Sequence, residues 1–244
     1  SSGDADGKND ILLEAATLEA AGAISMVARD GDIVMGAVAD MYFSDRATSR
    51  SSLLGLVKKK TRDQILDISH QVTSLSGTEI VGVAAQNLQI DGTRFVVSGT
   101  ADGDAAAGEL ALISVNGSTA FNAPVDIRAE SHYRSSSILW GLISNTKDLR
   151  SLASAAQGAS ADTAGDLLIN SGADLTMTAV DFDIDGQFHT DVAGATYLLA
   201  AIDMDYQALI QHKDNGIIMT DIRSEDMAER VTYNGIVAAG GVNF

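Results

Sequence analysis

Carboxylates at alternate positions are the residues of this chain whose type and spacing most resemble reaction or metal chemistry. They occur as Asp30 with Asp32, as Asp102 with Asp104, and as Asp181, Asp183 and Asp185. Side chains at i and i+2 share one face of a β-strand, so such a pair could act as acid and base or hold a cation. Acidic residues on the outer face and in the turns of an acidic fold give the same pattern without chemistry, and we prefer that interpretation.

The segment 181–192, DFDIDGQFHTDV, is the best match to a cation site. Asp181, Asp183 and Asp185 fit the Asp-x-Asp-x-Asp-Gly opening of a calcium loop, but Val192 stands where that loop needs a bidentate Glu. Apolar residues alternate with these Asp residues, which predicts a strand whose carboxylates face water. The three Asp residues are therefore weak calcium candidates, and we expect no other cofactor.

Other catalytic and metal patterns are missing from the sequence. The four His residues are isolated, with no second ligand at zinc spacing. A Ser nucleophile elbow and a phosphate-binding Gly loop are also missing. We therefore predict no catalytic residues and do not expect an enzyme.

Basic residues gather in one segment, where six of the sixteen Lys and Arg fall between Arg46 and Arg62. Beside them lies the apolar stretch SSLLGL, and a similar stretch, SSILWGL, follows later. Together these segments give a candidate contact surface made of Arg50, Leu53, Leu54, Lys58, Lys59, Lys60, Leu139 and Trp140. Such a surface would dock an anionic glycan or an acidic neighbour. The preferred alternative is a solvated hairpin whose charges discourage pairing between sheet edges.

Composition narrows the class of protein. The 244 residues include 23 Gly, one Pro and no Cys, and the formal net charge is −17. A negative field repels phosphates, which disfavours nucleic acids and anionic membrane surfaces as partners. No apolar run reaches the roughly 18 residues that a membrane span needs. The first residues lack the layout of a signal peptide, so we expect either an intracellular protein or an interior piece of a longer chain, and the repeats favour the piece.

Internal repeats are the main organising signal. Gly22, Gly108 and Gly194 each open a short apolar run and are spaced 86 residues apart. Gly31 with Gly117 keeps the same interval, as does Gly55 with Gly141. We predict one domain over 1–244 with three repeats, at about 22–107, 108–193 and 194–244. The third is shortened, because Gly216 follows Gly194 by only 22 residues, against 33 in the other copies.

Each repeat contains short alternating segments bounded by Gly, Asp and Asn, which is the pattern of β-strands. Such short strands indicate a coil whose turns stack on one another, roughly 4.8 Å apart. Segment 11–23 is rich in helix formers, yet we predict strand because it leads directly into an alternating segment. Two polar segments, about 41–75 and 130–161, are predicted as β-hairpin excursions from the coil. A short helix over 59–68 is the alternative in the first.

These features resemble the haemagglutinin repeats of filamentous-haemagglutinin-type exoproteins, which leave the cell by two-partner secretion. The matching residues are the rungs at 22–28, 165–170 and 240–244, together with polar stretches that have a Gly-flanked apolar centre, SRSSLLGLVKKK, RSSSILWGLISN and, less clearly, HKDNGIIMTD. The resemblance implies an all-β fold, a right-handed parallel β-helix. It also implies passage through an outer-membrane transporter, location outside a bacterial cell or on its surface, and a receptor or glycan of a host or neighbouring cell as partner. The family's secretion domain and toxin module are not seen in this sequence.

The expected function is that of a structural shaft and presentation segment in adhesion, biofilm formation or contact-dependent inhibition. One alternative is a surface or biofilm module stabilised by calcium, motivated by Asp181, Asp183 and Asp185. The other is a β-helical enzyme that degrades acidic polysaccharide, motivated by the carboxylate pairs.

Overall fold

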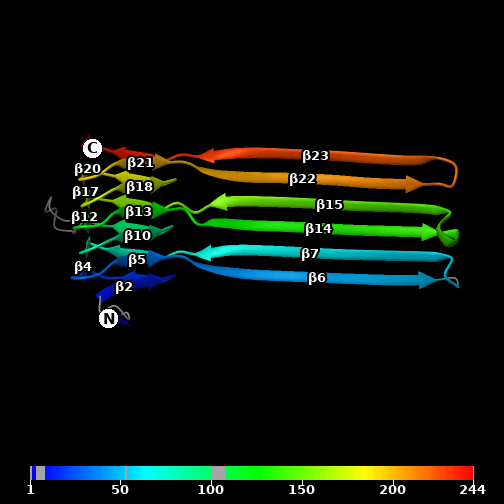
Figure 1. Cartoon of the computed structure of the whole chain (residues 1–244), viewed down its shortest axis with the longest axis horizontal. Coiled ribbons are helices and arrows are strands. Elements are labelled where there is room, and N and C mark those ends of the chain that lie inside the picture. The colour runs from blue at the N-terminus through cyan, green and yellow to red at the C-terminus, as the bar shows by residue number, and fades with distance from the viewer. Residues whose placement is uncertain (1, 4–8, 53, 100–107, 244) are drawn as a thin grey trace.

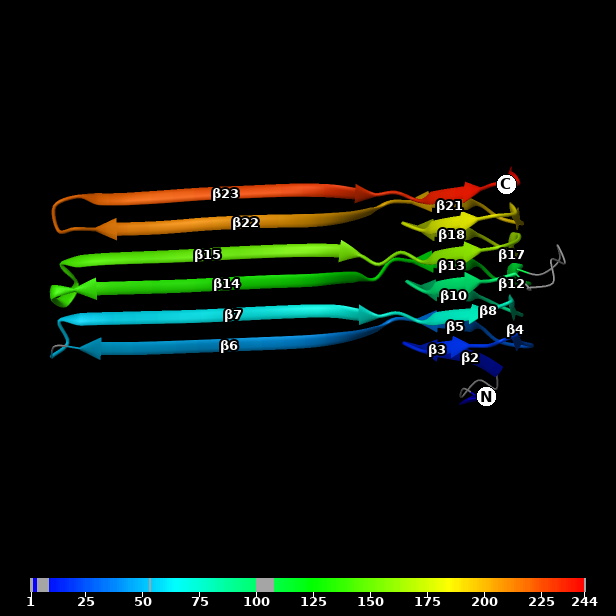
Figure 2. The same cartoon turned by 180° about the vertical axis from the view of Figure 1, so that it is seen from behind.

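The computed structural model describes residues 2–3, 9–52, 54–99 and 108–243. Apart from the 3-10 turn η1 (Leu139–Gly141), every regular element among these residues is a β-strand, so the predicted all-β class is confirmed. The strands build two parts, which lie side by side in Figure 1 and, from behind, in Figure 2. One is a stack of short strands, here called the coil. The other is a flat sheet of long strands that projects from it, here called the blade.

The coil has three sheets in which all neighbouring strands of successive turns are parallel. Sheet 1 contains β2 (Asn9–Glu14), β5 (Ile33–Gly36), β10 (Leu88–Asp91), β13 (Thr119–Asn122), β18 (Leu175–Thr178) and β21 (Thr196–Leu199). Sheet 2 contains β3 (Thr17–Glu19), β8 (Ser74–Gly77), β11 (Arg94–Val97), β16 (Ser160–Thr163), β19 (Asp181–Ile184) and β24 (Gly235–Ala238). Sheet 3 contains β4 (Ala23–Ala28), β9 (Glu79–Ala84), β12 (Leu110–Ser114), β17 (Leu167–Ser171), β20 (Gln187–Val192) and β25 (Gly241–Asn243). The short β1 (Ser2–Gly3) pairs antiparallel with β2.

The chain passes through sheets 1, 2 and 3 in that order and then starts the next turn, so the described strands complete six turns. Alternate side chains point into the coil and stack on their counterparts one turn away. In sheet 1, Ile33, Leu88, Thr119 and Leu175 form one such stack, and all four are buried. Aromatic side chains join the sheets: the ring centroid of Phe182 lies 5.6 Å from that of Phe121 and 6.2 Å from that of Phe188. The period-2 pattern therefore becomes the core of the coil.

Polar side chains link the turns at the corner between sheets 3 and 1. In each case a side-chain Oδ1 atom accepts a backbone N–H of the following turn: Asp10 from Asp32 at 2.8 Å, Asp32 from Asn87 at 2.7 Å, Asn87 from Ser118 at 3.1 Å, and Asp174 from Ala195 at 2.8 Å. Glycine is needed beside this ladder, because a Cβ atom on Gly31 would lie 2.0 Å from Asp10 Oδ1. Asp32, a member of one predicted carboxylate pair, therefore has a structural role.

The blade is one six-stranded antiparallel sheet built from three hairpins. The strands are β6 (Val38–Ser52), β7 (Val57–Gln71), β14 (Val125–Ile138), β15 (Ile143–Ala156), β22 (Ala201–Asp214) and β23 (Met219–Thr232). Each hairpin leaves the coil after a sheet 1 strand and returns to sheet 2, in the second, fourth and sixth turns. Neighbouring hairpins pair with each other through β7 with β14 and through β15 with β22.

A match of spacings explains why the three hairpins form one sheet. Turns of the coil and strands of a sheet are both about 4.8 Å apart. Two turns therefore rise by the width of one two-stranded hairpin. A hairpin on every second turn fills the blade without overlap and without a gap. The repeat of about 86 residues is this unit, one plain turn followed by one turn with a hairpin.

Both polar segments form antiparallel hairpins, over 38–71 and 125–156, so the predicted bounds of 41–75 and 130–161 were several residues late. The alternative of a helix over 59–68 is wrong, since β7 covers that range. Segment 11–23 forms strands, as predicted, because pairing with β5 and β8 outweighs its helix propensity. The third hairpin, over 201–232, was not predicted.

The alignment of Gly194 with Gly22 and Gly108 is wrong. Gly22 and Gly108 precede strands of sheet 3, whereas Gly194 precedes β21 of sheet 1, as Gly31 and Gly117 precede β5 and β13. The link between β11 and β12 spans residues 98–109, whereas only residues 185–186 join β19 to β20. Because this link is shorter, Gly194, which precedes a sheet 1 strand, falls 86 residues after Gly108, which precedes a sheet 3 strand. The third repeat therefore looked shortened.

Candidate functional site

The two faces of the blade differ in chemistry. Directly paired residues of an antiparallel sheet share a face, so the register assigns each side chain. Phe43, Leu66, Ala129, Leu152 and Tyr206 are successive partners across five strands and define what we call the Phe43 face. Thr48, Thr61, Arg134, Lys147 and Gln211 are likewise successive partners and define the Lys147 face.

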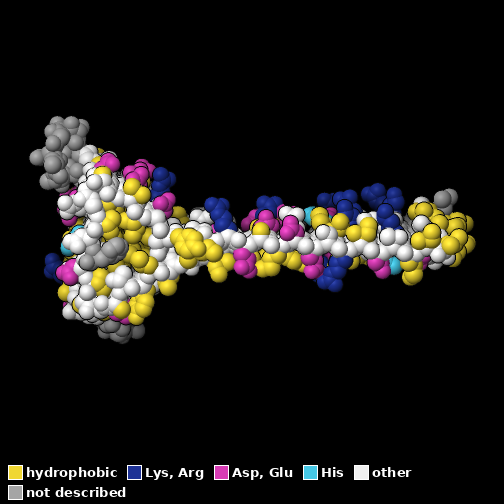
Figure 3. Space-filling view, turned by 90° about the horizontal axis from the view of Figure 1, so that it is seen from above, with side chains coloured by type: hydrophobic (Ala, Val, Ile, Leu, Met, Phe, Trp, Pro, Cys, Tyr) yellow, Lys and Arg dark blue, Asp and Glu magenta, His cyan; other side chains and the backbone are white. Residues whose placement is uncertain are grey.

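The outer half of the Lys147 face carries basic residues in two rows across the strands, which we call the cation rows. The first row contains Arg134 and Lys147, and the second contains Arg50, Lys59 and Lys213. Arg134 stands directly opposite Lys147, and Arg50 directly opposite Lys59, while Lys213 continues the second row beyond Asn145. Within the described ranges, none of these five cations forms a salt bridge. Lys59, Thr61, Arg134, Ser136, Asn145 and Lys147 line a shallow hollow of about 400 Å³. Figure 3 shows Lys and Arg side chains gathered along one side of the outer blade.

Three arginines of the Phe43 face, by contrast, are paired with carboxylates on the same face. The Nη2 atom of Arg62 lies 2.6 Å from Asp45 Oδ2, that of Arg150 lies 2.7 Å from Asp148 Oδ2, and that of Arg223 lies 2.6 Å from Glu225 Oε1. The hydrogen bond from the Arg62 guanidinium lowers the pKa of Asp45. These three guanidinium groups are therefore less available to an external anion than Lys58 and Lys60 of the same face.

A network of charged side chains lies on the inner half of the Lys147 face. His132 Nδ1 lies 2.9 Å from Asp63 Oδ1, and its Nε2 lies 3.3 Å from Glu130 Oε2. Glu130 also accepts a hydrogen bond from Arg128 Nε at 2.8 Å. The hydrogen bond with Asp63, then that with Glu130, raises the pKa of His132. The hydrogen bond from Arg128, then that from His132, lowers the pKa of Glu130.

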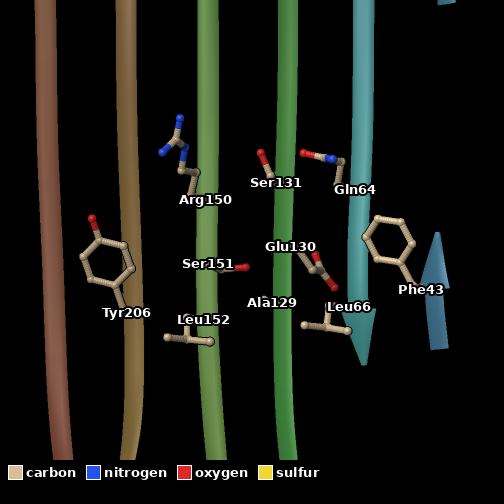
Figure 4. A pocket seen from close by; sticks show the side chains of 10 residues that line it. All are labelled: Phe43, Gln64, Leu66, Ala129, Glu130, Ser131, Arg150, Ser151, Leu152 and Tyr206. Atoms are coloured by element: carbon tan, nitrogen blue, oxygen red, sulfur yellow. The ribbon is translucent and has the colours of Figure 1, made fainter. Parts of the chain in front are cut away.

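An apolar hollow of about 410 Å³ opens on the inner half of the Phe43 face. Figure 4 shows the small side chains of Ala129 and Ser131 between larger ones, with Phe43 and Leu66 on one side and Leu152 and Tyr206 on the other. The hollow exists because Ala129 and Ser131 are too small to fill the space between the larger side chains. It takes side chains from five strands, so only knowledge of the strand pairing could have revealed it.

The three hairpin tips meet at the outer end of the blade. The N–H of Leu139 in the second tip donates to the carbonyl of Leu56 in the first at 2.9 Å. Trp140 and Leu142 of the second tip share a hollow with Ile217 and Met219 beside the third. The side chains are strongly exposed, Leu54 completely, Ile217 to 94% and Trp140 to 75%. These exposed apolar side chains of the three tips, which we call the cap, form the apolar group at the outer end of the molecule in Figure 3.

The structure brings most of the predicted contact residues together at this outer end. Leu54, Leu139 and Trp140 lie in adjacent tips, and Arg50 and Lys59 lie on the Lys147 face. Lys58 and Lys60 belong to the Phe43 face, because consecutive residues of a strand point to opposite sides. Leu53 lies outside the described residues. The sequence reasoning missed Arg134, Lys147, Lys213, Ile217 and Ile218. All five lie within a few residues of a tip glycine, Gly141 or Gly216, and this position in the sequence could have identified them.

The weak calcium candidates lie on the coil. Asp181 and Asp183 point outward from β19, Phe182 and Ile184 point inward, and Asp185 follows in the turn. Among the described residues, no group of three or more His, Asp or Glu side chains is placed to hold a metal ion. Asp102 and Asp104 lie outside the described residues. No helix in the described part of the chain is long and apolar enough to cross a membrane.

Comparison with known proteins found no matching family model, no similar curated protein and no similar solved structure. Function is therefore inferred from the molecule's own geometry. That geometry places unpaired cations and exposed apolar tips together, at the end of the blade that lies farthest from the coil (Figure 3).

Proposed function

We propose that this chain is a presentation segment of a secreted bacterial cell-surface exoprotein, in which the coil is the structural shaft and the blade is the contact surface. In this proposal the coil is a right-handed parallel β-helix of the filamentous-haemagglutinin type. It leaves the cell through an outer-membrane transporter and serves adhesion, biofilm formation or contact-dependent inhibition. Its partner is a receptor or glycan on a host or neighbouring cell.

The observation that carries the proposal is the joining of three hairpins into one blade. Strands of 14 or 15 residues hold the tips about 45 Å from the coil. Pairing between β7 and β14 and between β15 and β22 fixes the three tips side by side. A single hairpin would bring one small tip to a partner, whereas the blade brings three tips and the cation rows behind them as one surface.

The carboxylates of the coil support a structural role over an enzymatic one. Asp32 Oδ1 accepts hydrogen bonds from both the backbone N–H and Nδ2 of Asn87, and Asp174 Oδ1 accepts the N–H of Ala195. A carboxylate that holds two turns together is not free to move a proton to or from a substrate. Neither the polysaccharide-degrading enzyme nor the calcium-stabilised module has an observation of its own in its favour.

A variant without the blade tests the proposal. The third turn joins β10 to β11 through Gly92 and Thr93 alone, so the coil already contains a connection that needs no hairpin. Replacing 37–73, 123–159 and 200–234 by Gly-Thr should leave a β-rich protein that unfolds cooperatively. Fluorescently labelled parent protein should bind to the surface of cells from a bacterial and host panel, and the bladeless variant should not.

Two results would overturn the proposal. Equal binding by a folded bladeless variant would show that the blade is not the contact surface. Left-handed turns in a crystal structure would exclude the right-handed β-helix. If the bladeless variant does not fold, point substitutions at the tips and in the cation rows make the same comparison on an intact molecule.

A further inference from the structure

Charge is distributed very unevenly between the outer end of the blade and the rest of the chain. The three tip segments 48–61, 134–147 and 211–221 contain seven Lys and Arg against two Asp. The remaining residues contain nine Lys and Arg against 31 Asp and Glu. Exposed charges interact over about 8–10 Å at physiological salt, so a partner at the tips experiences the local positive charge and not the net charge of −17. The net charge of the whole chain therefore does not exclude an anionic membrane surface as a partner of the tips.

The tips carry apolar side chains where hairpin turns normally carry polar ones. Leu54, Leu139 and Trp140 adopt φ values of 54° to 55°, in the left-handed region, and Gly55 and Gly141 follow in the same region. Asn and Gly are the favoured residues in such turns, and a bulky side chain there is strained. Leu54 and Trp140 are also exposed, so the packing of the chain does not explain them. Strain of this kind at an exposed position points to a role in binding.

Apolar tips and cation rows stand in the order that a lipid surface requires. Apolar groups of peripheral proteins enter a bilayer by about 5–10 Å, and Trp favours the interface between chains and headgroups. The lysine run 58–60 starts at the second residue of β7. Arg134 lies four residues before the end of β14, and Lys147 lies four residues after the start of β15. At about 3.3 Å per residue, the cations lie within roughly 15 Å of the tips. With the tips inserted, this distance places them at the level of the lipid phosphates and just outside that level.

We propose that the outer end of the blade binds an anionic lipid membrane, with Leu54, Trp140, Ile217 and their apolar neighbours inserted and the cation rows against the headgroups. This inference rests on the proposed role of the blade as contact surface and adds the lipid surface of the cell to the receptor or glycan that the blade contacts. Single-stranded nucleic acid fits less well, because among the described residues of the cation rows there is no aromatic side chain on which bases could stack.

The sole tryptophan of the chain reports on the proposal directly. Trp140 is the only Trp, and it lies in the cap. Its fluorescence should shift to shorter wavelength when the intact protein is mixed with vesicles of phosphatidylglycerol and phosphatidylcholine. Vesicles of phosphatidylcholine alone should produce little shift, and added salt should weaken binding to the anionic vesicles. An unchanged spectrum with both kinds of vesicle would overturn the proposal.

Substitutions at the tips separate membrane binding from folding. L54N combined with I217N should reduce sedimentation with anionic vesicles by about tenfold or more, because two exposed apolar side chains are lost. Asn suits the left-handed backbone at Leu54, so the melting temperature should not fall. Trp140 stays in place as the probe. Full vesicle binding by the folded double variant would overturn insertion of the tips.

Substitutions of cations test the role of the charge. The triple variant K59Q, R134Q and K147Q removes unpaired cations, whereas R62Q, R150Q and R223Q removes the same number from ion pairs on the Phe43 face. Removing the unpaired set should weaken binding to anionic vesicles by about a hundredfold, and the control should weaken it far less. Equal losses would show that only net charge matters and would overturn the cation rows as the headgroup site.

The same variants distinguish this inference from the proposed function. If L54N with I217N loses vesicle binding and cell binding together, both stand. If the parent protein does not bind vesicles but still binds cells through the blade, the lipid inference fails and the presentation role remains, with a protein or glycan as partner. If the bladeless variant binds cells as well as the parent does, the presentation role fails first.

Discussion

The coil and the blade use β-strands in opposite ways. In the coil, short strands close around stacked side chains, and Phe182 is exposed to only 1%. In the blade, long strands form a single layer with both faces open to solvent, and Phe43 is exposed to 61%. The coil therefore draws its stability from burial, whereas the blade depends on its hydrogen bonds, on pairs across its strands and on its attachment to the coil.

This difference frees the blade for recognition. Its side chains carry little of the packing energy, so their identity can change without loss of the fold. Attachment of each hairpin at two points on the coil, together with pairing between hairpins, supplies the order that a single layer lacks on its own. Residues that bind a partner can then be strained or apolar, as Leu54 and Trp140 are.

The largest expected effect comes from removing a core aromatic ring. Phe182→Ala leaves a cavity between Phe121 and Phe188 and should lower the free energy of unfolding by about 3–5 kcal/mol. The matched change in the blade, Phe43→Ala, should cost less than about 1 kcal/mol, because most of that ring is already in water. Denaturant unfolding followed by circular dichroism measures both. Similar losses for the two variants would contradict the division between coil and blade.

A smaller effect is expected at the corner ladder. Asp32→Ala removes the oxygen that accepts two hydrogen bonds from Asn87 and should destabilise the coil by about 1–3 kcal/mol. Asp30→Ala, two residues earlier on an exposed position, should change stability by less than about 0.5 kcal/mol. Thermal unfolding of the pair is the measurement. If Asp30→Ala proved the more harmful, the ladder would not hold the turns as described.

How far the sequence could predict the structure also differs between the two parts. In the coil, alternation and Gly spacing led to the right kind of strand, because inward side chains must be apolar and tight corners exclude a Cβ atom. The error at Gly194 arose because glycine recurs at two different corners, before sheet 3 strands at Gly22 and Gly108 and before sheet 1 strands at Gly31, Gly117 and Gly194. Equivalent glycines of different corners look alike in a sequence.

In the blade, the two hairpins with strong apolar centres were predictable and the third was not. Its tip carries NGIIM, at 215–219, but Asp and Glu interrupt the alternation of apolar residues along 219–232. The pairing between hairpins could not be predicted at all, because it depends on the rise of the coil. Without it, Lys59, Arg134 and Lys147 are isolated basic residues. The register alone makes them neighbours on one face.

The smallest expected effect is a pH dependence of the blade, centred on His132. The carboxylates of Asp63 and Glu130 raise the pKa of His132, so the stabilisation by the charged imidazole is full below the ordinary His pKa of about 6.5 and is lost as pH rises through the raised value. Arg128 and His132 lower the pKa of Glu130, so its stabilisation is present above about pH 4.3 and is lost as pH falls. The network should hold β14 most firmly between these limits.

Because these side chains are partly exposed, the gain should be under about 1 kcal/mol. Amide hydrogen exchange in β14, compared between the parent protein and His132→Gln at each pH, measures it. The parent should be better protected than the variant in mildly acidic solution, and the two should converge in alkaline solution. Strands of the coil should show no such difference, since their protection comes from burial. A difference that grew with rising pH would assign the wrong charge state to His132, and the network would then owe its order to the backbone pairing alone.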